Sequence, residues 1–201
     1  MTQPDISVVR ATAADADELT GVLATAFLAD PISQWLFPDE ADRERLHPSF
    51  FRPFVELTLA DGEAYTTADR AAVTLWLPVD VHAHAEPDDL GPVFEAAIGP
   101  EYAKRFGVLD ELMTTNHPGH ENHAYLPFIA VRPDRQGHGL GAALLEHRLA
   151  ALDEEGTPAY LEASCLRNAA LYERLGFARM ENSIDLPDGP SLYPMWRKPS
   201  A

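Results

Sequence analysis

The sequence predicts an α/β fold in which helices flank a single sheet. Between residues 124 and 175, two strand patterns alternate with two helix patterns, an order typical of α/β proteins. Two further strand patterns precede the C-terminus and would close the sheet in antiparallel fashion. Because 201 residues are an ordinary length for one domain with a sizeable core, we interpret residues 1–201 as a single domain.

The first part of the chain predicts a strand, two helices and a hairpin. Thr12 and Asp15 resemble a helix N-cap with an acidic first turn, and apolar residues then recur at helical spacing. The second helix should bend or break near Pro48 and Pro53. The expected elements are a strand at 6–12, a helix after Thr12, a helix at 41–59 and hairpin strands at 63–67 and 71–79.

The second part begins with residues 79–123, a stretch rich in Pro, Gly and His that we interpret as an insertion near a binding site. The pattern is clearer after residue 123. The expected elements are helices at 93–98 and 102–116, a strand at 124–131, a helix at 139–155, a strand at 159–164, a helix at 168–175 and strands at 177–186 and 191–198.

The charge balance restricts the class of partner. Fifteen basic and thirty-two acidic side chains give a formal net charge of −17, which repels nucleic-acid phosphates and anionic membrane surfaces. We therefore expect neither nucleic acid nor membrane as a partner. The same charge either favours an amine-bearing small molecule or serves solubility alone.

The remaining composition suggests a cytoplasmic protein. Cys165 is the single cysteine, which excludes an internal disulfide and fits a reducing compartment, so we expect a buried, inert thiol. No apolar run approaches the ~20 residues of a membrane span. The N-terminal stretch lacks the pattern of a signal peptide.

A glycine-rich loop joins a predicted strand to a predicted helix. In "RQGHGLG", Gly137, Gly139 and Gly141 lie where free backbone N–H groups and the positive end of a helix meet. Glycine here costs roughly 0.5–1 kcal/mol against alanine, so bare backbone must serve a purpose. The loop could hold a pyrophosphate, or it could be a turn without a ligand.

Two common nucleotide motifs do not fit this loop. A Walker A loop ends in Gly-Lys-Ser/Thr, whereas this one ends in Gly-Ala-Ala. A dinucleotide fingerprint has wider glycine spacing and lies early in a βαβ unit. "VRPDRQGHGLG" instead resembles motif A of the GNAT family of N-acetyltransferases, Q/R-x-x-G-x-G/A, whose loop binds the pyrophosphate of acetyl-CoA.

The resemblance continues downstream in "YLEAS" and "RNAALYERLGF". It implies the GNAT fold, a mixed, mostly antiparallel central sheet flanked by helices, with acetyl-CoA as co-substrate bound where two parallel strands splay. It also implies a set of cofactor-binding residues. These are Ile129, Ala130, Val131, Gln136, Gly137, His138, Gly139, Leu140, Gly141, Ala142, Asn168 and Tyr172.

Two residues are candidates for catalysis. Tyr172 lies one helical turn after Asn168, and the resemblance places it beside the cofactor sulfur as a general acid; alternatively it packs against Leu175 and Phe177. Glu162 shares a strand face with Tyr160 and Ser164. Its carboxylate either acts as a base through water or pairs with a basic group.

Histidines and tryptophans offer further candidates. His117, His120 and His123 recur at three-residue spacing, but Pro118 and Gly119 break a helix there, so we expect a loop and no metal site. His82 and His84 form a second pair. Trp35 and Trp76 either belong to the core or line an aromatic acceptor pocket.

The sequence thus predicts an acetyl-CoA-dependent N-acetyltransferase that acts on the amine of a small molecule, with an antibiotic-like or aminonucleoside acceptor as one candidate. Direct attack on the thioester needs no activated nucleophile, and Cys165 has no evident partner for such a role. The alternative is a catalytically idle module that binds or senses acyl-CoA. Either a monomer or a homodimer would suit this function.

Overall fold

One mixed sheet organises the chain, and the computed structural model describes residues 6–83 and 91–200 of it. Within these residues the strand order is β1-β2-β3-β4-β5-β8-β6, and β7 pairs with β8 outside this path. The strands are β1 (Val8–Arg10), β2 (Glu63–Thr67), β3 (Ala72–Val79), β4 (His123–Val131), β5 (Ala159–Ala163), β6 (Ala178–Arg179), β7 (Ile184–Asp185) and β8 (Ser191–Arg197).

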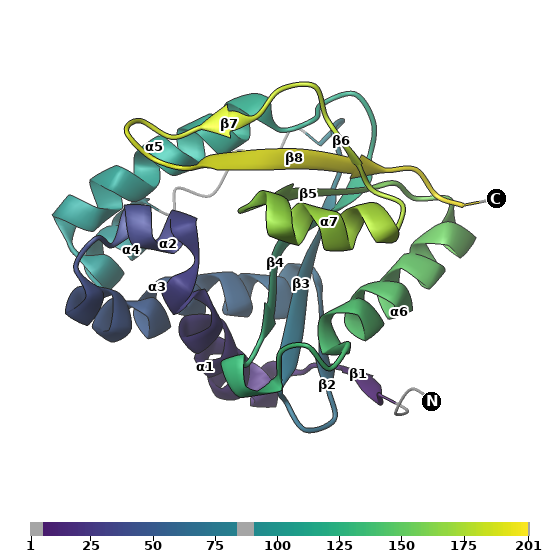
Figure 1. Cartoon of the computed structure of the whole chain (residues 1–201), viewed down its shortest axis with the longest axis horizontal. Coiled ribbons are helices and arrows are strands. Elements are labelled where there is room, and N and C mark those ends of the chain that lie inside the picture. The colour runs from purple at the N-terminus through teal and green to yellow at the C-terminus, as the bar shows by residue number, and fades with distance from the viewer. Residues whose placement is uncertain (1–5, 84–90, 201) are drawn as a thin grey trace.

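The β4–β5 pair is the single parallel pairing in the described sheet, and it is short. The register joins Ala124 to Ala159 and Tyr125 to Tyr160, and the pairing ends there. Figure 1 shows that β3 and β4 then run in a different direction from β5 and β8. The sheet therefore opens between β4 and β5.

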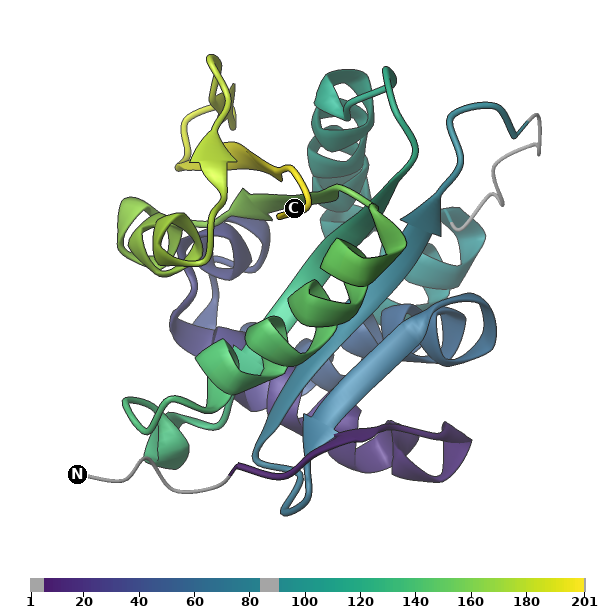
Figure 2. The same cartoon turned by 90° about the vertical axis from the view of Figure 1, so that its right-hand side faces the viewer.

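Helices cover both faces of the sheet, and Figure 2 shows α6 lying across one of them. Leu145 and Leu149 of α6 pack on Leu126 and Leu161, whereas α1 and α3 enclose a second core around Leu75. No described helix is both long and apolar enough to cross a membrane. The helices are α1 (Ala16–Ala26), α2 (Pro31–Leu36), α3 (Glu40–Asp61), α4 (Gly91–Ile98), α5 (Pro100–Asn116), α6 (Leu140–Glu155) and α7 (Leu166–Arg174).

The α3 helix continues through both prolines, so of the predicted bend or break at Pro48 and Pro53 the break is wrong. Each proline removes one N–H donor, which deprives the carbonyls of Glu44 and Ser49 of their helical partners. Both of these residues are exposed, so water can satisfy the carbonyls. On its other side α3 buries several aromatic side chains, and this packing outweighs the loss of two hydrogen bonds.

The predicted strand at 177–186 is also wrong. Two separate two-residue strands, β6 and β7, replace it, and the residues between them are exposed. The backbone N–H of Met180 donates to the carbonyl of Pro194 at 2.8 Å, after which the chain leaves the ladder. Apart from α2, which has no predicted counterpart, the other strands and helices lie within a few residues of their predicted positions.

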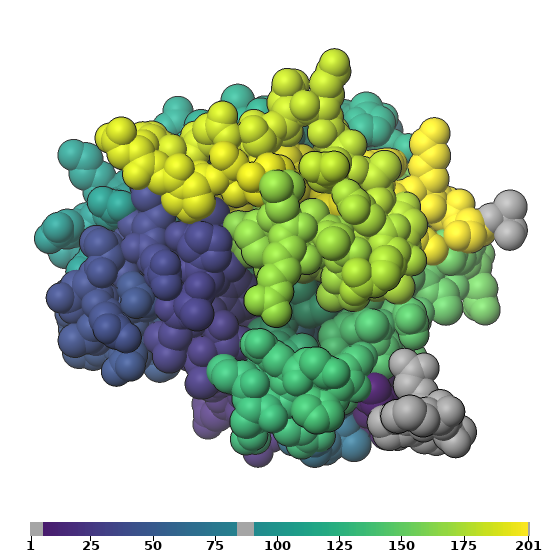
Figure 3. Space-filling model, viewed as in Figure 1, coloured from purple at the N-terminus to yellow at the C-terminus, as the bar shows by residue number. Residues whose placement is uncertain are grey.

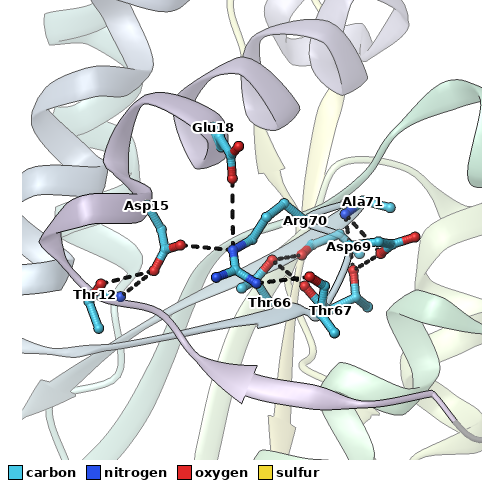
Figure 4. A network of polar contacts seen from close by, with 10 residues as sticks. Thr12, Asp15, Glu18, Thr66, Thr67, Asp69, Arg70 and Ala71 are labelled. Atoms are coloured by element: carbon cyan, nitrogen blue, oxygen red, sulfur yellow. Dashed lines mark hydrogen bonds and ion pairs between the residues drawn. The ribbon is translucent and has the colours of Figure 1, made fainter.

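A polar network fixes the β2–β3 hairpin against the start of α1 (Figure 4). Arg70, at a φ of 55° in the hairpin turn, donates to Asp15 at 2.8 Å. Asp15 in turn accepts the backbone N–H of Thr12 at 2.8 Å in a capping box, as predicted. Asp69 of the same turn pairs with Arg135 at 2.6 Å, so the network also holds the segment that precedes the glycine loop.

Candidate active site

The glycine loop leaves the N-terminus of α6 without a side-chain cap. Gly137 and Gly139 have φ values of 78° and 81°, a region that glycine adopts without strain. Gly139 is the N-cap residue, and no side chain accepts a hydrogen bond from the first turn of α6. The N–H groups of Leu140, Gly141 and Ala142 therefore remain available to an anion, and the helix dipole favours one there.

Side chains of the loop hold its shape. Gln136 Nε2 donates to the carbonyl of Val131 at 3.2 Å, which ties the loop to the end of β4. The ring Nδ1 of His138 lies 2.9 Å from the carbonyl of Gln136. A Cβ on Gly141 would lie 3.5 Å from Val131 and 3.6 Å from Ile129, so this glycine lies directly against the end of β4.

The exposed edge of β4 offers backbone donors to the opening between β4 and β5. The N–H of Arg132 donates to the carbonyl of Ala71 on the β3 side at 2.8 Å. Since successive N–H groups of a strand point to opposite sides, those of Ile129 and Val131 point away from β3. This refines the predicted set, because the N–H of Ala130 is directed toward β3.

Tyr172 lies on the buried side of α7, against the opening. Its side chain is 6% exposed, packs on Leu161 and Ala163 of β5, and lies with its ring 6.1 Å from that of Phe177. Burial raises the pKa of the Tyr172 hydroxyl well above its usual value, and the negative charge of Asp30 raises it further. The phenol therefore keeps its proton at neutral pH.

Asn168 and Tyr172 occupy different environments although one helical turn separates them. Asn168 is exposed, and its Nδ2 donates to Ser164 Oγ at 3.2 Å. Cys165 immediately precedes α7 as its N-cap residue and is half-buried, so the prediction of a buried thiol is wrong. Cys165 lies two residues after the end of β5, in the turn that leads into α7.

The structure adds Asp30 to the site, a residue that the sequence reasoning did not assign. Its carboxyl caps α2 by accepting the N–H groups of Ile32 at 2.9 Å and Ser33 at 3.2 Å. Burial raises its pKa, while hydrogen bonds, first that of the Ser164 hydroxyl, act in the opposite direction. The Asp-Pro pair predicts the cap, but its nearness to Tyr172 depends on tertiary structure.

The two roles of the Asp30 carboxyl predict different stabilities for two variants. Asp30→Ala removes the cap and should lower the free energy of unfolding by about 1 kcal/mol. Asp30→Asn keeps a capping oxygen and removes a buried charge, so this variant should be at least as stable as the parent protein at pH 7. Urea unfolding of the three proteins measures the difference. Equal destabilisation of both variants would contradict the capping role.

Glu162 lies on the opposite face of β5 from Tyr172. Burial raises the pKa of its carboxyl to about 7, while the hydroxyls of Tyr160 and Tyr125 act in the opposite direction. Tyr160 is fully buried, and its pKa is raised by burial and by the charge of Glu162. Glu162 Oε1 and the Tyr160 hydroxyl have no hydrogen-bond partner among the described residues. The carboxyl can thus gain or lose a proton near neutral pH.

The histidines that follow α5 pack against aromatic side chains near Glu162. His117 Nε2 and His123 Nε2 lie 3.0 Å apart, and the ring of His120 lies 4.8 Å from that of Trp196. In residues 6–83 and 91–200, no three His, Cys, Asp or Glu side chains form a group that could hold a metal ion. His84, one of the predicted second pair with His82, lies outside the described residues.

The core alternative is confirmed for Trp76, whereas Trp35 is only partly buried. Trp76 is 2% exposed and belongs to the core beside α6. Trp35 of α2 is half-buried; its Nε1 donates to the carbonyl of Pro187 at 2.9 Å, and the guanidinium of Arg105 lies 4.6 Å above its ring. Trp35 thus connects α2 to α5 and to the loop after β7.

The space-filling view shows a recess beside the glycine loop (Figure 3). The glycine loop and α7 lie on its two sides, and the chain around α1 and α2 lies beside it (Figure 3). The site therefore combines an uncapped helix N-terminus, strand N–H groups and a buried phenol. A carboxyl of raised pKa lies across β5 from that phenol.

Comparison with known proteins agrees with this geometry. A model of the acetyltransferase (GNAT) family matches residues 96–177. An uncharacterized N-acetyltransferase of Schizosaccharomyces pombe is 26% identical over 188 residues, which cover 86% of this chain and 74% of that protein. A mycothiol acetyltransferase of Streptomyces coelicolor is 32% identical over 125 residues, or 54% of this chain and 40% of that protein.

A solved structure covers nearly the full length. The crystal structure of histone acetyltransferase HPA2 and related acetyltransferase from Corynebacterium glutamicum has a TM-score of 0.74 and 27% identity, covering 98% of this chain and 97% of that one. The mixed sheet that opens between β4 and β5 is the GNAT fold. The family model, the relatives and the solved structure together support a GNAT-family N-acetyltransferase.

Proposed function

We propose that the protein transfers the acetyl group of acetyl-CoA to the amine of a small molecule by direct attack on the thioester. The observation that carries this proposal is the uncapped N-terminus of α6 beside the opening between β4 and β5. A panel of amines assayed for release of free thiol tests it. An acyl-CoA-binding module without activity would bind acetyl-CoA but release no thiol with any amine.

The residues present fit acetyl-CoA. The N–H groups of Leu140, Gly141 and Ala142 would bind its pyrophosphate, and those of Ile129 and Val131 would bind its pantetheine arm and polarise the thioester carbonyl. Asn168 would contact the same arm. When bound, acetyl-CoA supplies an activated acetyl group on sulfur. We propose this set of contacts, together with Gln136, His138 and Gly139, as the cofactor site.

Two side chains would move protons. Glu162, with a carboxyl pKa of about 7, would accept a proton from the incoming ammonium through a water, which leaves a neutral amine able to attack. Tyr172 would donate its phenolic proton to the departing sulfur, and its raised pKa keeps that proton in place until transfer. The two groups lie on opposite faces of β5, so each serves one side of the reacting bond.

An antibiotic-like or aminonucleoside compound is the acceptor that we propose to test first. The stretches "AAVTLWLPV", "RNAALYERLGF" and "RKPSA" resemble puromycin N-acetyltransferase. This chain has Asp30 before Pro31 where that enzyme has an aromatic residue, so the two acceptor pockets should differ. The insertion at 79–123 contributes α5, whose Asp110 acts electrostatically on Tyr125. Puromycin therefore belongs in the amine panel beside smaller amines.

The proposal also covers the partners, the location and the oligomeric state of the protein. With a net charge of −17, we propose a cytoplasmic enzyme that binds neither nucleic acid nor membrane. Residues 1–201 would act as one domain, as a monomer or a homodimer. Light scattering would measure the oligomeric state.

The pH dependence of the reaction tests the role of Glu162. A base must be deprotonated to act, so kcat/KM should rise with pH through about 7, the pKa of this carboxyl. Glu162→Gln should lower kcat/KM by about 10²- to 10⁴-fold and remove this limb. Steady-state assays between pH 5.5 and 9 measure it. A Gln variant whose profile overlays the parent profile would leave Glu162 a structural role.

Stability provides the control for this variant. The folded carboxyl has a pKa of about 7 against an ordinary value of 4.5, so folding favours its protonated form. Its contribution to stability is therefore complete below pH 4.5 and is lost as the pH rises through 7. Glu162→Gln keeps a neutral side chain at every pH. It should unfold at the same or a higher temperature than the parent protein at pH 8, so lost activity cannot reflect unfolding.

A further inference from the structure

Two histidines pack on the tyrosines that contact Glu162. His117 directly follows α5, and its ring meets those of Tyr125 and Tyr160 edge to face, with centroid distances of 4.9 and 4.8 Å. On its other side the ring stacks on His123 at 5.1 Å. One imidazole therefore touches both phenol rings beside the carboxyl.

The hydrogen bonds of the histidine pair determine its protonation. His123 Nδ1 lies 2.8 Å from the carbonyl of Glu121 and must donate to it, because a carbonyl only accepts. A neutral His123 then accepts at Nε2, so His117 must donate from its own Nε2 across the 3.0 Å contact. Burial and the charge of His123 lower the pKa of His117 to about 4. Both rings are thus neutral at pH 7, and the bond fixes the ring plane of His117.

The orientation of the His117 ring affects the pKa of the Glu162 carboxyl through the two tyrosines. The hydroxyls of Tyr160 from β5 and Tyr125 from β4 pull the pKa of Glu162 down against the effect of burial. Asp110 of α5 is a further charged group that acts on Tyr125. The position of each hydroxyl sets its effect on the carboxyl, so a small rotation of either phenol ring changes that effect, although the Tyr160 hydroxyl forms no hydrogen bond to a described residue. The imidazole ring of His117 touches both phenols, so it can set the orientation of the two phenol rings.

We propose that His117 is a positioning residue, whose ring holds Tyr125 and Tyr160 so that their hydroxyls lie beside the Glu162 carboxyl. It touches no reacting atom and acts through the two phenols. The inference rests on the proposed function only where it predicts a change in the reaction rate. The contacts around Glu162 are the same whether or not that residue is the base.

Replacing His117 with leucine tests the inference. Leucine keeps apolar volume and so keeps water out, but it removes both the flat ring and the bond to His123. The phenols should then turn away, and the pKa of Glu162 should rise by about 0.5–1 unit above the parent value. NMR titration of ¹³C-glutamate-labelled protein measures this pKa, and the resonance is assigned by its loss in Glu162→Gln. An unchanged pKa in folded His117→Leu would overturn the inference.

His120 offers a matched control. It belongs to the same loop and packs on Trp196, whereas its ring contacts neither Tyr125 nor Tyr160. His120→Leu should leave the pKa of Glu162 within about 0.2 unit of the parent value. An equal shift in both variants would mean that any change in this loop disturbs Glu162, and positioning by His117 would be refuted.

A second background tests whether the effect passes through the hydroxyls. In a Tyr125→Phe/Tyr160→Phe protein the carboxyl has already lost both neighbouring hydroxyls, so adding His117→Leu should shift its pKa no further. A full shift in that background would show that His117 acts on Glu162 directly, against the inference.

Activity separates this inference from the proposed function. If Glu162 is the base, the acidic limb of kcat/KM in His117→Leu moves to higher pH by the amount that NMR measures. If the NMR pKa moves and the limb stays, positioning holds and the assignment of Glu162 as the base fails. If neither the NMR pKa nor the acidic limb moves in His117→Leu, while Glu162→Gln still removes that limb, the assignment of Glu162 as the base holds and positioning by His117 fails.

Discussion

Replacing Gly139 with glutamate is expected to weaken acetyl-CoA binding by at least about 100-fold, or about 2.7 kcal/mol. Gly139 is the N-cap of α6, directly before the N–H groups that we propose to bind the pyrophosphate. A carboxylate there would occupy the anion site and repel the phosphates. Isothermal titration calorimetry measures the affinity.

Two control variants separate charge from backbone strain. Gly139 has a φ of 81°, so any side chain there is strained, and Gly139→Gln carries that strain without the charge. Gly156, at the other end of α6, has a φ of 67° and open space around its Cα. Gly156→Glu should therefore leave the affinity unchanged. A folded Gly139→Glu protein with parent affinity would remove the glycine loop from the site.

Local chemistry made the glycine loop and α6 predictable from the sequence. Glycines at positive φ, an apolar strand before them and a helical apolar pattern after them lie within one short stretch, and each signal indicates the same structure. The 177–186 segment gave a misleading signal, because its apolar residues pack on other elements without extending along one ladder. The α3 prolines failed as breakers because aromatic packing outweighed them.

The candidate site was predictable only where its residues lie near one another in sequence. Alternation along β5 placed Glu162 beside Tyr160, and the two do act on each other. Tyr125 joins them through the parallel register of β4 and β5, which no local pattern encodes. Asp30 reaches Tyr172 from a helix at the other end of the chain. The spacing of His117 predicts a loop residue or a metal ligand, whereas its observed contacts are aromatic.

A large effect on the rate is expected from Tyr172. Tyr172→Phe should keep the fold and the affinity for acetyl-CoA while kcat falls by about 10- to 10⁴-fold, the range for losing a positioned general acid. The side chain packs through its ring on Leu161 and Phe177, and phenylalanine preserves those contacts. Loss of the hydroxyl alone therefore reports on proton donation. Tyr65 packs against the same core but belongs to β2, which lies away from α7 in Figure 1, so Tyr65→Phe should leave kcat unchanged.

A series of acyl donors distinguishes proton donation from positioning by Tyr172. A more acidic leaving thiol needs less help from an acid, so the loss caused by Tyr172→Phe should shrink as the pKa of that thiol falls. Burial keeps the phenol protonated, so no alkaline limb from this residue should appear below pH 10. Turnover of acetyl-CoA at the parent rate would refute the assignment. Equal losses with every donor would mean that the hydroxyl orients the thioester and transfers no proton.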